Sequence, residues 1–252
     1  MQSETYDKRL AAFISLLKSA KKAVFFGGAG VSTESGLKDY RSKDGMYNTV
    51  REFGVPPETI LSHDFLFGHP DVFYRFYNTY FLLGNPKPNR AHTALADLEA
   101  KGILSAVITQ NVDGLHTAAH SKSVYELHGT SARHYCVKCG AAYPKEKLIR
   151  LEGAVPKCEK CGGFVRPDIV MYGEMLNDET VDGAVKAMKQ ADLLIVGGTS
   201  LAVYPAAGFI GYYQGKDIIL INQGETPLDN EATLVFRESI GKVLGEAVSA
   251  LA

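Results

Sequence analysis

The segment Ala23-Val-Phe-Phe-Gly-Gly-Ala-Gly30 joins a short apolar run to a glycine-rich turn. Such a run predicts a buried strand, and the residues from Ser32 to Ser35 could cap a helix that follows it. Three more apolar runs have the same form, because glycine or polar residues follow each of them: Ile103 to Thr109, Leu193 to Val196 and Ile218 to Ile221. Continuous apolar strands are typical of a parallel sheet that is buried on both faces.

Helical patterns alternate with these strands, as at Ala11 to Leu17, Ala91 to Lys101 and Thr180 to Gln190. This alternation predicts an α/β fold with a doubly wound, Rossmann-like parallel sheet. Two stretches interrupt it: residues 41–88 are rich in aromatic side chains and predict a helical insertion, and residues 129–167 hold all the cysteines. We therefore predict a large domain formed by residues 1–40, 89–128 and 168–252, and a small domain formed by residues 41–88 and 129–167.

The four cysteines form two pairs, Cys136-Val-Lys-Cys139 and Cys158-Glu-Lys-Cys161, with 18 residues between them. This C-x2-C spacing is typical of a zinc site, and four sulfur ligands leave no open position, so the zinc is expected to be structural. Gly140 and Gly162-Gly163 follow the pairs, where tight turns favour residues that tolerate a positive φ. Two disulfides are the alternative. Thiolate ligands persist best in a reducing compartment, which predicts a cytoplasmic protein.

Composition narrows the class of protein further. Hydrophobic residues make up 46% of the chain, which is enough for a sizeable core. The formal net charge of -1 argues against a general nucleic-acid or membrane-surface role. The polar start of the chain predicts neither a signal peptide nor a transit peptide, and no apolar run approaches the roughly 18 residues of a membrane span.

The polar ends of the predicted strands should line one cleft, because ligands of open α/β sheets bind outside the carboxyl ends of the strands. The backbone N–H groups around Gly28 and Gly30, with the N-terminus of the next helix, could hold a pyrophosphate. Thr33 replaces the usual third glycine of G-x-G-x-x-G, and residues 46–50 contain no acid to hold a ribose, which argues against hydride transfer. Thr199, Ser200 and Asn222 could contact ribose or adenine instead, or simply form turns.

Two further features carry possible chemistry. Four polar side chains crowd the strand end Thr109-Gln-Asn-Val-Asp-Gly-Leu-His116, although Asn and Asp-Gly also favour turns. His128 directly precedes the cysteine segment and could act as a general base, because an imidazole is largely neutral at working pH. A lone histidine is more often structural.

Together these motifs resemble the sirtuin family of NAD-dependent protein lysine deacylases, in its bacterial form. The matching strings follow the family order from about residue 21 to residue 222. They are Gly28-Ala-Gly-Val-Ser32, Thr109-Gln-Asn-Val-Asp-Gly-Leu-His116, His128-Gly129, the two cysteine pairs, Arg166-Pro-Asp-Ile-Val170, Tyr172-Gly-Glu174, Gly198-Thr-Ser-Leu201 and Ile221-Asn222.

The resemblance implies that NAD binds in the cleft with its nicotinamide in an inner pocket. Asp113 would hold the carboxamide, and Gln110, Asn111 and His128 would contact the nicotinamide ribose. Ala29, Leu37, Tyr40 and Val112 would complete the inner pocket. The other NAD contacts that we expect are Gly28, Gly30, Thr33, Asp39, Arg41, Gly198, Thr199, Ser200, Asn222 and Ile240.

The resemblance also implies a mechanism. The acyl-lysine carbonyl oxygen attacks the ribose carbon as nicotinamide leaves, which gives an alkylimidate. His128 then acts as general base on the ribose hydroxyls, Asn111 helps to order water or ribose, and the products are free lysine and O-acyl-ADP-ribose. A mono-ADP-ribosyltransferase on the same scaffold and a non-catalytic NAD-sensing module are the alternatives.

Acyl-lysine proteins are the partners that the resemblance implies, with the substrate peptide extended between the two domains as an added strand. The Val170 carbonyl would accept the acyl-lysine N–H, and His128 and Tyr172 would wall the tunnel. Lys38 and Tyr40 depart from the usual family pattern. Val50 stands where relatives that remove acidic acyl groups carry arginine, which predicts a preference for acetyl and other short neutral groups. A monomer is favoured.

Overall fold

The computed structural model describes residues 5–38 and 50–251. Its main sheet has six strands: β1 (Ala23–Gly27), β2 (Leu104–Thr109), β3 (Val124–Glu126), β7 (Leu193–Gly197), β8 (Asp217–Ile221) and β9 (Leu234–Phe236). They lie in the order β3-β2-β1-β7-β8-β9, and every neighbouring pair is parallel. Counted along the chain this is the order 3-2-1-4-5-6 of the Rossmann fold, so the predicted fold class is confirmed.

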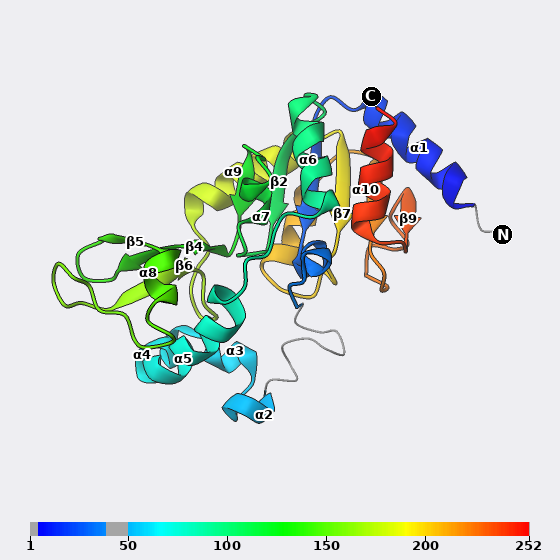
Figure 1. Ribbon diagram of the computed structural model, residues 1–252. Coiled ribbons are helices and arrows are strands. Elements are labelled where there is room, and N and C mark those ends of the chain that lie inside the picture. Colours follow the sequence, from blue (N-terminus) through cyan, green and yellow to red (C-terminus); the bar gives the residue numbers. More distant parts are fainter. Residues whose placement is uncertain (1–4, 39–49, 252) are drawn as a thin grey trace.

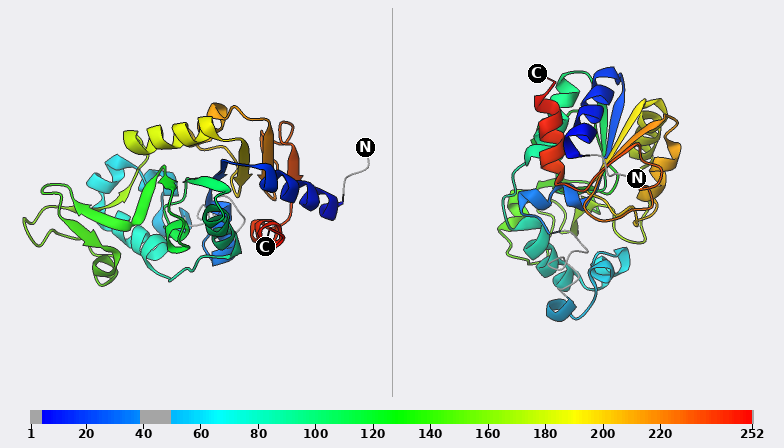
Figure 2. Two further views of the ribbon diagram at one scale, coloured as in Figure 1. Left: turned by 90° about the horizontal axis from the view of Figure 1, so that it is seen from above. Right: turned by 90° about the vertical axis from the view of Figure 1, so that its right-hand side faces the viewer.

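Helices cover both faces of this sheet, as the right-hand view of Figure 2 shows. One face packs against α1 (Tyr6–Ser19), α6 (Arg90–Ala100) and α10 (Ile240–Ser249). The other face packs against α9 (Asp178–Gln190) and the 3-10 helix η5 (Ala206–Tyr212). Phe25 points into the first core, and its neighbours Val24 and Phe26 point into the second. Burial on both faces explains why the strand sequences are continuously apolar and not alternating.

A second, antiparallel sheet has the order β5-β4-β6 and consists of β4 (Gly129–Cys136), β5 (Ala142–Pro144) and β6 (Val165–Ile169). Figure 1 shows it at one end of the molecule, close to the short helices that precede α6. These are α2 (Val50–Phe53), α3 (Pro57–Ile60), α4 (His63–Gly68), α5 (Pro70–Tyr77) and the π-helix η4 (Asn78–Leu82), and α8 (Lys145–Ile149) follows β5.

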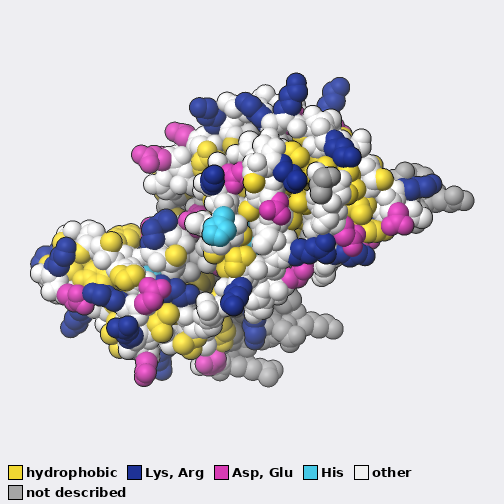
Figure 3. Space-filling model, turned by 45° about the horizontal axis from the view of Figure 1, so that its top comes forward, with side chains coloured by type: hydrophobic (Ala, Val, Ile, Leu, Met, Phe, Trp, Pro, Cys, Tyr) yellow, Lys and Arg dark blue, Asp and Glu magenta, His cyan; other side chains and the backbone are white. Residues whose placement is uncertain are grey.

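The helical stretch and the cysteine stretch share one hydrophobic core, although more than 50 residues separate their midpoints. Phe73, Tyr74, Phe76 and Tyr77 of α5 pack in it with Val165 of β6. The expected helical insertion therefore exists and packs as expected, while the domain boundaries drawn from the sequence stay a prediction. On the face shown in Figure 3, positive and negative side chains are interspersed over both parts of the molecule.

The segment after β1 differs from the expectation. No α-helix directly follows the glycine turn within the described residues; instead two 3-10 turns, η1 (Ala29–Val31) and η2 (Thr33–Ser35), lead to Gly36 at φ +82°. Strands β3 and β9 were also missed from the sequence, because strands of three residues offer too short a pattern, and the ten-residue helix α10 was not identified. Among the described helices, none is long and apolar enough to cross a membrane.

Candidate functional site

A cleft of about 780 Å³ opens at the carboxyl ends of β1, β2, β7 and β8 and continues toward the antiparallel sheet. It falls in the size range typical of cofactor and ligand sites. Every expected NAD or peptide residue within the described part of the chain lines it. They are Gly28, Ala29, Gly30, Thr33, Leu37, Gln110, Asn111, Val112, Asp113, His128, Val170, Tyr172, Gly198, Thr199, Ser200, Asn222 and Ile240. Asp39, Tyr40 and Arg41 lie outside the described residues.

The glycine turn after β1 packs directly against the turn after β7. The Gly30 N–H donates to the Gly198 carbonyl at 2.8 Å, and a Cβ on Gly30 would lie 2.8 Å from the Gly198 Cα. Gly198 itself has φ +60°, so both glycines are required by this close approach. Because the Gly30 N–H is already engaged, a pyrophosphate contact in this turn has to come from other donors than this one.

A hydrogen-bonded group of side chains forms where β2 ends. The Asn111 amide donates to Ser32 Oγ at 3.1 Å, and Ser32 Oγ donates to Asp113 Oδ2 at 2.7 Å. The Leu115 N–H, at the start of α7 (Leu115–Ala118), donates to Asp113 Oδ1 at 2.9 Å. Ser32 thus holds two of the four polar side chains that the sequence assigned to the nicotinamide end, Asn111 and Asp113. Sequence reasoning left it out of the site, although it closes the Gly28–Ser32 string and lines the cleft.

Two buried histidines lie behind this group. His92 Nε2 is 3.4 Å from Ser32 Oγ, and its Nδ1 joins a capping box with Asn89 at the start of α6. Burial lowers the pKa of His92, although nearby Asp113 opposes the shift. The His116 ring lies 4.7 Å from the His92 ring, and burial together with His92 lowers the pKa of His116 to about 3. Both imidazoles are therefore neutral at neutral pH, and neither of them places a positive charge beside Asp113.

His128 is oriented by a single backbone bond. Its Nδ1 lies 2.9 Å from the Gln110 carbonyl oxygen, which can only accept, so Nδ1 carries the proton and Nε2 is left to accept one. Burial lowers the pKa of His128, and the bond to Gln110 opposes this in part. The ring is consequently neutral at neutral pH, which is the state that a general base needs. The Gln110 side chain in turn donates to Thr199 Oγ1 at 3.2 Å and links the ends of β2 and β7.

The segment after β6 forms the edge of the cleft next to His128. The Val170 N–H donates to the His128 carbonyl at 2.9 Å, while no hydrogen bond from the described residues reaches the Val170 carbonyl. Tyr172 is held to the chain before α4, because its N–H donates to the Leu61 carbonyl at 2.9 Å and its carbonyl accepts from the His63 N–H at 2.9 Å. The edge therefore presents a backbone acceptor where the sequence predicted the acyl-lysine N–H to bind.

A buried ion pair holds this edge in place. The Arg166 guanidinium donates to both carboxylate oxygens of Glu174, at 2.5 and 2.8 Å, and also to the Ile169 carbonyl at 2.9 Å. The Met171 N–H donates to the same carboxylate at 2.9 Å. Burial alone would raise the pKa of Glu174, but the bonds from Arg166 and Met171 bring it below its usual value. The carboxylate is thus charged, and it fixes the residues on both sides of Val170.

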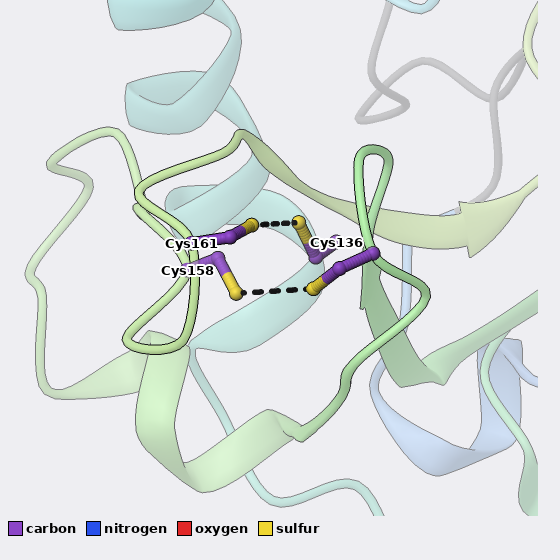
Figure 4. Close-up of side chains that lie close together, drawn as sticks. Cys136, Cys158 and Cys161 are labelled. Carbon is purple, nitrogen blue, oxygen red and sulfur yellow. Dashed lines mark hydrogen bonds between the residues drawn. The ribbon is translucent and has the colours of Figure 1, made fainter.

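The four cysteines converge at the far end of β4 (Figure 4). Their sulfur atoms all lie within 4.8 Å of one another, with Cys136–Cys161 and Cys139–Cys158 each at 3.6 Å. Four thiolates about 2.3 Å from a tetrahedral zinc would lie about 3.8 Å apart, so the cluster fits this ion, and the separations exclude disulfide bonds. Gly140 and Gly162 both have φ +69°, as predicted. Gly163 leaves room for the cysteine sulfur atoms, because a Cβ there would lie 3.0 Å from Cys136 Sγ.

Comparison with known proteins agrees with this geometry. Residues 28–205 match the sequence model of the Sir2 family. The NAD-dependent protein deacetylase of Clostridium acetobutylicum is 52% identical over 229 residues, which cover 91% of this chain and 94% of the relative. The protein of the same name from Clostridium perfringens is 49% identical over 243 residues, 96% of this chain and 99% of the relative.

Solved structures agree as well. A structure of Sir2 with a p53 peptide and NAD+ has a TM-score of 0.85 at 38% identity, covering 96% of this chain and 98% of that chain. A structure of Sir2 bound to an acetylated peptide has a TM-score of 0.83 at 37% identity, with the same coverage of 96% and 98%.

Proposed function

The chain belongs to the Sir2 family, and on this premise we propose that it is an NAD-dependent protein lysine deacetylase. The proposed reaction converts an acetyl-lysine protein, NAD and water into the lysine protein, nicotinamide and O-acetyl-ADP-ribose. The amide bond and the bond between nicotinamide and ribose break, and an ester bond to the ribose forms. The observation that carries the proposal is the neutral His128, oriented by Gln110 beside Asn111 at one end of the cleft.

NAD, when bound, supplies an electrophilic ribose carbon and a stable leaving group. In the proposal, Asp113 and Asn111 bind the nicotinamide end, and Ser32 keeps both in place through its two hydrogen bonds. His128 Nε2 accepts the proton of a ribose hydroxyl, and the Gln110 carbonyl, which accepts from the Nδ1–H, stabilises the resulting imidazolium. The remaining NAD contacts expected from the sequence, Ile240 included, are proposals that the lining of the cleft supports.

Acyl-lysine proteins are the proposed substrates, bound as an extended peptide to the edge at Val170 and Tyr172. Main-chain contacts of this kind give affinity without strict sequence preference. The zinc site is structural: Cys136, Cys139, Cys158 and Cys161 would use all four positions of a tetrahedral ion. The need to keep four thiolates reduced supports a cytoplasmic location, and a monomer is the proposed state.

The test is mass spectrometry of an acetyl-lysine peptide incubated with the protein, with and without NAD. We expect NAD-dependent loss of the acetyl group with nicotinamide and O-acetyl-ADP-ribose in equal amounts. A His128→Ala variant should lose about 10² to 10⁴ of the rate while it keeps its zinc. His120→Asn is the matched control, because His120 is exposed and its φ of +73° suits asparagine. An intact peptide with ADP-ribose attached to protein would instead identify a mono-ADP-ribosyltransferase.

A further inference from the structure

The cleft extends beyond His128 into the region between η4 and the antiparallel sheet. Tyr80 and Phe81 of η4, and Leu83 after it, line this extension together with Val112, Ser131 and Lys145. Helix α8, which Lys145 begins, packs against η4. The extension is therefore mainly apolar, as an acyl chain requires, and Lys145 is the one cation among the described residues that line it.

The order of residues along β4 shows where this cation lies relative to the reaction. His128 directly precedes β4, and the Ser131 N–H and Oγ donate to the Val112 carbonyl at 2.7 and 2.8 Å. Farther along, Arg133 pairs with Pro144, and Lys145 follows directly. The ladder with β6 is irregular here, because the four residue steps from Thr130 to His134 lie opposite a single step of β6, so Arg133 lies only a few strand rises beyond His128. An acyl group must therefore extend past the reacting carbonyl to meet Lys145, whose side chain lines the same cleft.

The glutamates that line the cleft bind other partners and form no ion pair with Lys145. Glu174 is bound to Arg166, Glu238 to Arg9, and Glu34 accepts from the Gly241 N–H. Within the described part of the chain, no carboxylate lies within ion-pair distance of Lys145. Lys147, two residues farther on, differs in this respect, because it forms an ion pair with Glu159 at 2.8 Å. Burial lowers the pKa of Lys145 and only its neighbour Glu146 opposes the shift, so an anion in the extension would gain a partly desolvated partner.

We propose that Lys145 recognises acyl groups that end in a carboxylate, which makes the chain a deacylase for acidic acyl-lysines such as glutaryl-lysine. This rests on the proposed function, since the glutaryl group would follow the same path from lysine to ADP-ribose with NAD and water as co-reactants. The proposal replaces the preference for short neutral acyl groups that was expected from Val50 with a preference for acidic ones. The cation belongs to α8 in the cysteine segment and not to the helical insertion, where Val50 stands in place of the arginine of other relatives.

The test compares two peptides that differ only at the end of the acyl chain: glutaryl-lysine and pentanoyl-lysine, each with five acyl carbons. Dissociation constants are measured by calorimetry without NAD, and kcat/KM is measured with NAD. In the wild-type protein we expect glutaryl to be favoured, and Lys145→Met should lower the glutaryl-to-pentanoyl ratio about tenfold or more, the usual size of a hydrogen bond to a charged group. Lys147→Met removes the same charge two residues away and should leave the ratio within about twofold.

The outcomes separate this inference from the proposed function. If Lys145→Met and Lys147→Met change the ratio equally, or if the wild-type protein binds pentanoyl better, the role of Lys145 is refuted even when acetyl peptides are turned over. If the binding ratio depends on Lys145 but no acyl peptide is turned over with NAD, recognition of the acyl carboxylate by Lys145 holds, while the proposed function and the deacylase activity that rests on it fail. If neither peptide binds or reacts, both fail.

Discussion

Removal of Arg166 should damage the peptide edge of the cleft without touching the NAD end. In Arg166→Met the side chain keeps its apolar stem but loses both bonds to Glu174 and the bond to the Ile169 carbonyl. Glu174 then keeps only the Met171 N–H as a partner. The residues on both sides of Val170 lose a shared anchor, so we expect the KM for the acyl peptide to rise far more than the KM for NAD.

The size of the effect follows from burial. The Arg166 side chain is 7% exposed and that of Glu174 20%, and breaking one side of a buried pair costs about 3 to 5 kcal/mol. Because Glu174 keeps some contact with water, we expect the lower end, about 3 kcal/mol of the free energy of unfolding. Arg133 pairs with Asp168 on the same strand β6 and, at 3.7 Å, with Glu126. Glu126 is 15% exposed, but Arg133 itself is 63% exposed and Asp168 41%, so Arg133→Met should cost about 1 kcal/mol.

Urea unfolding of both variants measures the stability, and initial rates at varied peptide and varied NAD measure the two KM values. The reasoning is refuted if Arg166→Met costs no more stability than Arg133→Met, or if the KM for NAD rises as much as the KM for the peptide. A double variant, Arg166→Met with Glu174→Leu, removes both charges and should regain part of the stability. It should not regain peptide affinity, since the Met171 N–H still lacks its carboxylate.

Three further predictions concern the base and the metal site. Burial lowers the pKa of His128, and the neutral ring is the active form. As the pH is lowered, kcat/KM should therefore fall only below pH about 6.5. A fall that begins above pH 7 would contradict this assignment. Chelation should remove one zinc per chain and unfold residues 129–167. Hydrogen exchange should then show a loss of protection in these residues and not at β1. Unchanged protection would exclude a structural metal. Gly163→Ala should weaken zinc binding because its Cβ would crowd Cys136 Sγ at 3.0 Å. Gly211→Ala is the control, because a Cβ there meets nothing within 4 Å, and this variant should retain the metal in a zinc-release titration.

The sequence predicted the parts of the fold that depend on local pattern. The strands now labelled β1, β2, β7 and β8 were found within a residue or two of their bounds, because burial on both faces makes each of them continuously apolar. The four cysteines were equally clear, because their spacing alone specifies a shared ion. The short strands β3 and β9 were missed, since three residues carry no period. The turn after β1 was read as a helix start, whereas packing against Gly198 confines it to 3-10 turns.

The same distinction between local pattern and tertiary contact applies to the site residues. Those that end a predicted strand, such as Gln110, Asn111 and Asp113, could be expected at the cleft, because parallel strands bring their carboxyl ends together. Ser32 and Lys145 could not, because each matters through contacts that only the folded chain makes. Ser32 meets Asp113 across 81 positions of sequence. Lys145 enters the cleft because β5 pairs with β4 and turns α8 toward η4.

The arrangement of β4 and β6 explains why a metal far from the reaction can still govern it. Cys136 ends β4 and pairs with Val165, while the opposite end of the same ladder joins Gly129 to Ile169. His128 and Val170 are the next residues at that end, and they are themselves joined by the bond from the Val170 N–H to the His128 carbonyl. The five β6 residues of this ladder span roughly 13 Å, because four residue steps of β4, from Thr130 to His134, lie opposite a single step of β6. The sulfur cluster therefore fixes one end of a two-stranded ladder, and the proposed base and peptide acceptor occupy the other. Loss of the metal frees the first end, and the base and the peptide acceptor are then held by the ladder pairs beside Gly129, the bond from the Val170 N–H to the His128 carbonyl, and the pair of Arg166 with Glu174.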